Sequence, residues 1–192
     1  MNNSMLPLYG FSRMAEKIRL ISASINNFAD AIEAKIRLTP SQKKILKKNY
    51  IYSDKHKGKA AFVIVNGPSL AQQDISWLGE YITFCVSGFW KHEAVSLWQP
   101  TYYSLLDKNF FNNSEATIEF YSGLKSRINQ STFFLPLYRG YDAVDRYKFL
   151  PSDRCQFVAS IGDRNIGVDL TNIVGSFAGV SSFALSQAIY MG

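Results

Sequence analysis

Short apolar runs separated by longer polar segments are the feature of this sequence that most constrains its fold. None of the runs alternates strictly between apolar and polar residues, so each predicts a strand buried on both faces. The five runs lie at residues 60–65, 82–86, 102–106, 132–137 and 156–161. Segments suited to helices lie between them, most clearly at residues 70–79, 91–98 and 114–128. This order predicts an α/β fold with a mostly parallel sheet covered by helices on both faces.

Basic residues gather in the first third of the chain. Residues 1–60 hold twelve of the 21 Lys and Arg residues but only four of the 15 Asp and Glu residues. We therefore divide the chain into a basic helical arm, residues 1–58, and a near-neutral domain, residues 59–192. The lysines of the arm are not interleaved with aromatic residues that could stack on bases, so nucleic acid is not an expected partner.

The arm itself contains two expected helices. Apolar residues recur at steps of four and three over residues 13–36, which predicts an amphipathic helix with the stripe Met14, Ile18, Ile21, Ile25, Phe28, Ile32 and Ile36. Thr39 before Pro40 predicts a second, short helix that ends near Lys48. On one interpretation, residues 13–48 make a peripheral contact with the inner face of a membrane. On the other, which the mixed charges of the long helix favour, the stripe packs on the domain or on a second copy in a homo-oligomer.

Several classes of protein are disfavoured by the composition. Cys85 and Cys155 lie in apolar stretches without the CxxC or Cys/His spacing of a metal site, so we expect two buried free thiols and no metal. No apolar run reaches the roughly 18 residues of a membrane span. The first residues also lack the apolar core of a signal peptide. The sequence therefore predicts a cytoplasmic protein.

The first apolar run ends at a small polar turn, Asn66-Gly67-Pro68-Ser69. In open parallel sheets, ligands bind beyond the carboxyl ends of the strands, where the first turn can approach a phosphate. Gly67 can adopt a positive φ and leaves room for a ligand, and Pro68 suits the start of a helix. Asn66 and Ser69 add hydrogen-bonding side chains. The turn matches neither a GxGxxG fingerprint nor a GxxxxGK[ST] loop, so these residues also fit an ordinary turn.

Three segments together resemble a known bacterial group. They are FVIVNGPSLAQQDISWLGEYITFCVSGFW, PTYYSLLDKNFF and GSFAGVSSFALSQAIYMG. The group includes lipooligosaccharide sialyltransferases, motility accessory factors that modify flagellin, and MptE-like hydroxymethylpterin diphosphokinases. The resemblance spans about residues 60–192. It implies a Rossmann-like three-layer α/β/α core and, for the transferases, a CMP-activated nonulosonic acid as donor, with no essential metal site.

The resemblance also assigns nucleotide-binding residues. Ser87 falls where the sialyltransferases have an asparagine that contacts the donor, and its single hydroxyl cannot reproduce both groups of an amide. Asp107 falls at another polar donor contact, with the N-cap of a helix as the alternative role. The start of the late helix matches small residues that face the nucleotide, or that allow close helix–sheet contact. The full set is Asn66, Gly67, Pro68, Ser69, Ser87, Asp107, Gly175 and Ser176.

The resemblance implies a further strand and a histidine base after the late helix, so we expect a domain that is truncated at its C-terminal end, and the catalytic residues are unassigned. His56 is expected to be a solvated histidine of the linker and His92 a histidine of a surface helix. Residues 138–153 have no clear period and are expected to form a loop or insertion near the cleft. At their spacing, Asp142 and Asp145 are expected to be solvated rather than to coordinate a cation.

The leading hypothesis is a glycosyltransferase domain that binds a nucleotide-activated sugar as co-substrate. It would transfer the sugar to a surface glycan or protein in polysaccharide biosynthesis, without a further cofactor. One alternative is an MptE-like pterin diphosphokinase, which would need Mg²⁺ and acidic ligands. The other is a non-catalytic nucleotide-binding or assembly module.

Overall fold

The computed structural model describes residues 38–160 and 168–192, together with residues 14, 17–18 and 21–22. Most of the expected helix over residues 13–36 therefore lies outside the described residues. The five described positions of that segment are helical. Met14, Ile18 and Ile21 are each more than half exposed, so the domain does not cover this part of the apolar stripe.

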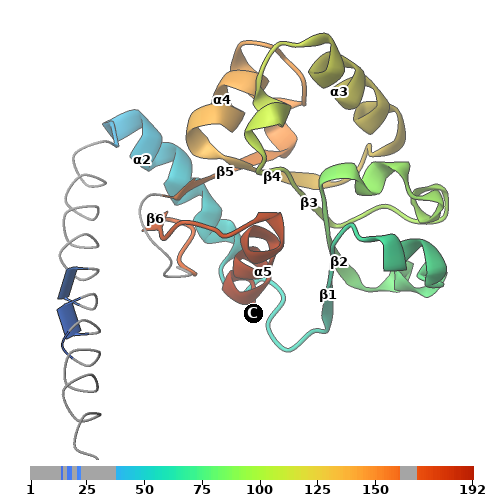
Figure 1. Ribbon diagram of the computed structural model, residues 1–192, viewed down its shortest axis with the longest axis horizontal. Helices are drawn as coiled ribbons and strands as arrows, with labels where there is room; N and C mark the ends of the chain where they lie inside the picture. Colours follow the sequence, from blue (N-terminus) through green and yellow to red (C-terminus); the bar gives the residue numbers. More distant parts are fainter. Residues whose placement is uncertain (1–13, 15–16, 19–20, 23–37, 161–167) are drawn as a thin grey trace, which may run out of the picture.

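A sheet of six parallel strands forms the centre of the domain (Figure 1). The strands are β1 (Ala61–Ile64), β2 (Ile82–Val86), β3 (Tyr102–Ser104), β4 (Thr132–Pro136), β5 (Cys155–Ser160) and β6 (Ile173–Val174). Each strand pairs with the next one in the sequence, so β1 and β6 are the two edges. All five expected strands are present, and the two-residue β6 was not expected from its sequence.

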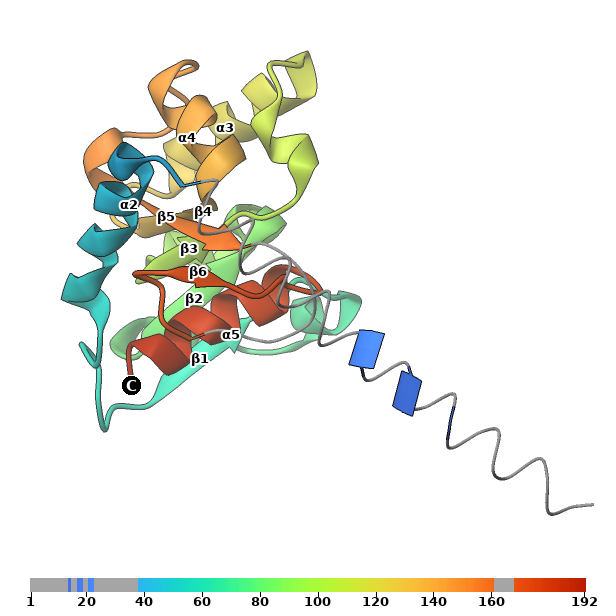
Figure 2. The same ribbon diagram turned by 90° about the vertical axis from the view of Figure 1, so that its left-hand side faces the viewer.

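Helices cover both faces of the sheet, which confirms the three-layer, Rossmann-like α/β/α architecture. One face packs against α2 (Pro40–Lys47), α3 (Glu115–Arg127) and α4 (Leu137–Asp145). The other face packs against α5 (Val180–Tyr190), which lies across β1, β2 and β3 (Figure 2). Neighbouring residues of one strand serve the two layers: Tyr103 is buried under the first set of helices and Tyr102 under α5.

The expected helices at residues 70–79 and 91–98 are wrong. Short 3₁₀ turns replace them: η2 (Pro68–Gln72), η3 (Ser76–Glu80), η4 (Ser87–Lys91) and η5 (Glu93–Ser96). The carboxylate of Asp74 accepts hydrogen bonds from the backbone N–H and the hydroxyl of Ser76, at 3.0 and 2.7 Å. Nδ1 of His92 accepts one from the N–H of Ala94 at 3.2 Å. These local bonds compete with the i to i+4 pattern and break each segment into two.

The expected loop at residues 138–153 is also wrong in its first half, because residues 137–145 form α4. The helix packs tightly on the preceding strand: a Cβ added at Gly140 would lie 2.5 Å from Cβ of Leu135. Ala143 and Val144 are buried in the same core. A glycine in mid-helix therefore allows close contact with the sheet at this position. The remaining short turns are η6 (Lys108–Phe111) and η7 (Ser152–Arg154).

The short helix of the arm belongs to the domain. Thr39 caps α2 in a reciprocal bond with Gln42, as the sequence predicts, and Leu46 is buried. In the following η1 (Lys48–Tyr52), the buried Asn49 side chain donates hydrogen bonds of 2.8 Å to the carbonyl oxygens of Phe157 and Leu170. Tyr52 then enters the core on the α5 face. The segment from α2 to Tyr52 thus passes around β5 and joins both layers.

Two further expectations concern the cysteines and membrane insertion. Cys85 and Cys155 are free and buried, as predicted. Burial raises the pKa of the Cys155 thiol to about 12, and it also raises the pKa of Cys85, so burial disfavours the thiolate form of both residues. Within the described part of the chain, no helix combines the length and apolar character needed to cross a membrane.

Candidate functional site

The carboxyl ends of β1, β2 and β3 lie at one edge of the sheet, because all three strands are parallel neighbours. The strands lead respectively into the Asn66–Ser69 turn, into Ser87 and into the segment that contains Asp107. The fold thus places the segments that carry the three expected polar positions at one end of the sheet. We refer to this region, where the strands end, as the carboxyl edge. It is distinct from the two outer strands, β1 and β6.

The turn after β1 is open to solvent. All four of its residues are exposed, and Ser69 lines a cavity of about 580 Å³ together with Val65 and Gln73. The side-chain amide of Asn66 donates a 3.1 Å hydrogen bond to the carbonyl oxygen of Val86, the last residue of β2. This bond fixes the turn of β1 against the end of β2, while the turn itself stays accessible.

The backbone of Gly67 is extended, with φ −152° and ψ 159°. The turn therefore does not use the left-handed conformation that glycine permits. A Cβ added at Gly67 would meet nothing closer than the hydroxyl of Ser69, at 3.8 Å. The folded chain therefore leaves open space beside the backbone of Gly67 and does not itself require glycine at this position.

Ser87 has a left-handed backbone with φ +48°, which is uncommon for a residue with a side chain. One hydrogen bond to its carbonyl oxygen holds it in place. The hydroxyl of Tyr103 donates a 2.7 Å hydrogen bond to the carbonyl oxygen of Ser87 and accepts one of 2.9 Å from the N–H of Trp90. Tyr103 is fully buried, and this burial raises its pKa. Strained positions of this kind collect at ligand sites, where the surrounding structure maintains them.

Asp107 caps the short η6 turn. Its carboxylate accepts a 2.9 Å hydrogen bond from the N–H of Asn109, and the side chain is exposed. The alternative that the sequence left open, an N-cap, is thus what the structure shows. β3 ends at Ser104, two residues earlier than expected, and so Asp107 lies in the loop after the strand rather than at its end.

The late helix starts later than expected. α5 begins at Val180, with Gly179 as its N-cap, so the prediction that Gly175 and Ser176 open the helix is wrong. Both residues lie instead in the connection between β6 and α5. Because α5 follows the carboxyl end of a parallel strand, its N-terminus is at the carboxyl edge. Its last residues lie near the opposite edge, where the carbonyl of Tyr190 accepts a hydrogen bond from the N–H of Asp54.

The sequence did not predict a contact between two buried polar side chains near the carboxyl edge. The hydroxyl of Ser104, at the end of β3, donates a 2.8 Å hydrogen bond to Oε1 of Gln187 on α5. Both residues are fully buried, and Nε2 of Gln187 has no hydrogen-bond partner among the described residues. A glutamine in a helix otherwise rich in small residues is the one signal that the sequence offers for this contact.

Neither histidine has the role expected of it. Nε2 of His56 lies 2.7 Å from the hydroxyl of Tyr102, at the amino end of β3, so His56 is a half-buried packing residue rather than a solvated one. Burial, and then the charges of Lys55 and Lys59, lower its pKa. His92 stacks on the ring of Phe89 and precedes a 3₁₀ turn, not a surface helix.

The acidic, histidine and cysteine side chains of the described residues do not form a candidate metal site. Over residues 38–160 and 168–192, no group of three or more His, Cys, Asp or Glu side chains is arranged to hold an ion. Asp145, expected to be solvated, is exposed and lies 3.7 Å from the Lys148 amine.

Comparison of the chain with protein-family models, with curated proteins and with solved structures found no match.

Proposed function

We propose that the carboxyl edge binds a nucleotide-activated sugar, with a CMP-linked nonulosonic acid as the favoured donor. The observation that carries the proposal is the hydrogen bond between Asn66 and the carbonyl of Val86. It joins the exposed turn to Val86, the last residue of β2, which directly precedes the strained residue Ser87. An accessible, rigid turn at this position of a parallel sheet is the arrangement in which phosphate-bearing ligands bind.

The backbone N–H groups of the turn, and those in the first turn of α5, would hold the phosphate of the donor. In the transfer step, the hydroxyl oxygen of the acceptor forms a bond to the anomeric carbon. The bond from that carbon to the phosphate oxygen breaks, and CMP leaves with the electron pair. Hydrogen bonds to the phosphate would stabilise the leaving group as its charge develops. The acceptor would be a surface glycan or protein, and its proton passes to a base that we do not assign.

Calorimetric titration with CMP, CTP and GTP, each with and without Mg²⁺, tests the proposal. We expect CMP to bind without metal and to bind more weakly to Asn66→Ala. Asn113→Ala, which removes another exposed asparagine, is the matched control and should bind as the parent does. Triphosphate binding that requires Mg²⁺ would instead support a pterin diphosphokinase. No binding of any nucleotide would contradict the proposal and favour an assembly module.

A further inference from the structure

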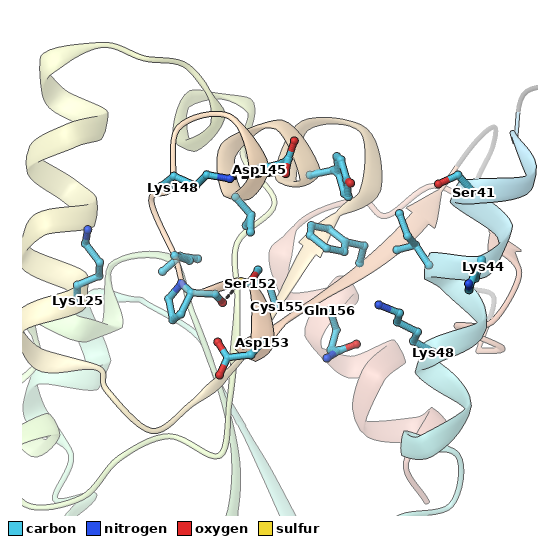
Figure 3. Close-up of a pocket in the computed structure, with 16 residues that line it drawn as sticks. Ser41, Lys44, Lys48, Lys125, Asp145, Lys148, Ser152, Asp153, Cys155 and Gln156 are labelled. Carbon is cyan, nitrogen blue, oxygen red and sulfur yellow. Dashed lines mark hydrogen bonds and ion pairs between the residues drawn. The ribbon is translucent and has the colours of Figure 1, made fainter.

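A second cavity lies at the opposite end of the sheet. It has a volume of about 960 Å³ and opens between α2, α4 and the amino end of β5 (Figure 3). The strands are parallel, so this position is remote from the carboxyl edge. Any ligand of this cavity is therefore separate from the proposed nucleotide. We call it the α2–α4 cavity.

The rim of the α2–α4 cavity is basic. Lys44 extends from α2, Lys48 from the start of η1, Lys125 from α3 and Lys148 from the segment after α4, while the acidic side chains of the lining are Asp145 and Asp153. Asp145 pairs with Lys148 at 3.7 Å. The other three lysines make no ion pair within the described part of the chain. Lysines of α2, η1 and α3 thus line one opening from different sides, which favours an anion.

Lys148 has an unusual backbone conformation. Its φ is +53°, in the left-handed region that a residue with a side chain seldom occupies. The strained residue connects α4 to the buried Phe149 and Leu150, and its side chain lies on the rim. Glycine would adopt this backbone more easily, so a lysine here keeps a charge at the cavity at some conformational cost.

The floor of the cavity is apolar, in contrast to its rim. It is formed by Ile45, Val144, Leu150 and Phe157, of which the last three are buried. Ser41, Ser152 and Gln156 add polar side chains to the lining. An inorganic ion would use only the rim. A phosphate attached to an apolar body would use both parts, since burial of its apolar surface adds to the charge attraction.

From this arrangement we propose that the α2–α4 cavity is a phosphate-binding site, with the headgroup of a lipid as the favoured source of the phosphate. The lysines bind the phosphate oxygens and the apolar floor receives the first carbons of the chains. The site does not depend on the nucleotide proposal, because it uses none of the residues of the carboxyl edge. It would give the domain a contact with anionic lipid on the side that carries the basic helix α2.

The experiment measures binding of two soluble probes to the full chain by calorimetry: dihexanoyl phosphatidic acid and inorganic pyrophosphate. The test variant is Lys44→Gln with Lys48→Gln. The matched control is Lys43→Gln with Lys47→Gln, which removes the same charge from two exposed lysines of α2 that do not line the cavity. A third variant, Lys44→Arg with Lys48→Arg, retains the charge. Thermal unfolding of each variant shows that it is folded.

We expect dihexanoyl phosphatidic acid to bind, with affinity reduced about tenfold in the test variant and little changed in the control. The arginine variant should bind as the parent does. Binding of the lipid tighter than of pyrophosphate supports a lipid headgroup, whereas equal binding supports the site with free phosphate as its ligand. The proposal is overturned if neither probe binds, or if the control loses as much affinity as the test variant.

Discussion

The hydroxyl of Tyr103 donates a 2.7 Å hydrogen bond to the carbonyl oxygen of Ser87, and so a buried residue of β3 fixes the strained residue that follows β2. The same hydroxyl accepts a bond from the N–H of Trp90. One core side chain thus sets the backbone of the loop that borders the candidate site.

Removal of this hydroxyl should destabilise the fold. Tyr103→Phe leaves a carbonyl and an N–H without their partner in a part-buried position, and we expect a loss of about 1–3 kcal/mol in the free energy of unfolding. Urea unfolding measures it. Tyr138→Phe, at an exposed tyrosine, is the control and should change little. Equal stabilities of the Tyr103→Phe protein and the parent would show that the bond does not hold the loop.

Relief of the strain at Ser87 should have the opposite effect. Glycine adopts φ +48° without the steric cost that a Cβ brings, so Ser87→Gly is expected to gain about 0.5–1 kcal/mol of stability. Ser176→Gly, at an exposed serine whose φ is not positive, should bring no gain. The comparison uses the same urea experiment. A loss of stability in Ser87→Gly would mean that the side chain, rather than the backbone, stabilises this position.

Stability should also depend on pH through His56. Its pKa in the folded chain is below the ordinary value of 6.5, mainly because of burial and then because of Lys55 and Lys59. The unfolded chain therefore binds a proton more readily, and the free energy of unfolding falls as the pH drops below about 6.5. Urea unfolding at pH 7.5 and pH 5.5 measures this fall, which should be smaller in His56→Gln. If the variant shows the full fall, the histidine does not contribute to it.

The strands were predictable because each is a short, mostly apolar run without strict polar alternation, the pattern of strands in a sheet covered on both faces. The expectation of burial on both faces is wrong for β1, an edge strand whose Ala61 is exposed. The segments after β1 and β2 were not predictable. The secondary structure of these segments depends on Asp74 and His92. Their side chains accept hydrogen bonds from nearby backbone N–H groups and so interrupt a helix. The sequence did not predict α4, because a glycine usually disfavours a helix. Gly140 is tolerated here because it allows close contact with Leu135, and the composition of the segment does not reveal that contact.

The candidate site was predictable in part for the same reason. A polar turn after a buried strand locates the carboxyl edge, so Asn66 to Ser69 and Ser87 could be placed there from the sequence. The left-handed backbone of Ser87 and its hydrogen bond from Tyr103 depend on tertiary contacts. The sequence near these two residues predicts neither feature. The start of α5 at Val180 was missed because small residues before it resemble those within it.

The most direct measurement of the central claim is the CMP affinity of Gly67→Ala. The backbone at Gly67 is extended and a Cβ there meets no atom within 3.5 Å, so alanine should leave the free energy of unfolding almost unchanged. If the turn receives the phosphate of a nucleotide, that Cβ obstructs the ligand, and we predict binding at least about tenfold weaker than in the parent. A stable Gly67→Ala protein that binds CMP as tightly as the parent would contradict the account.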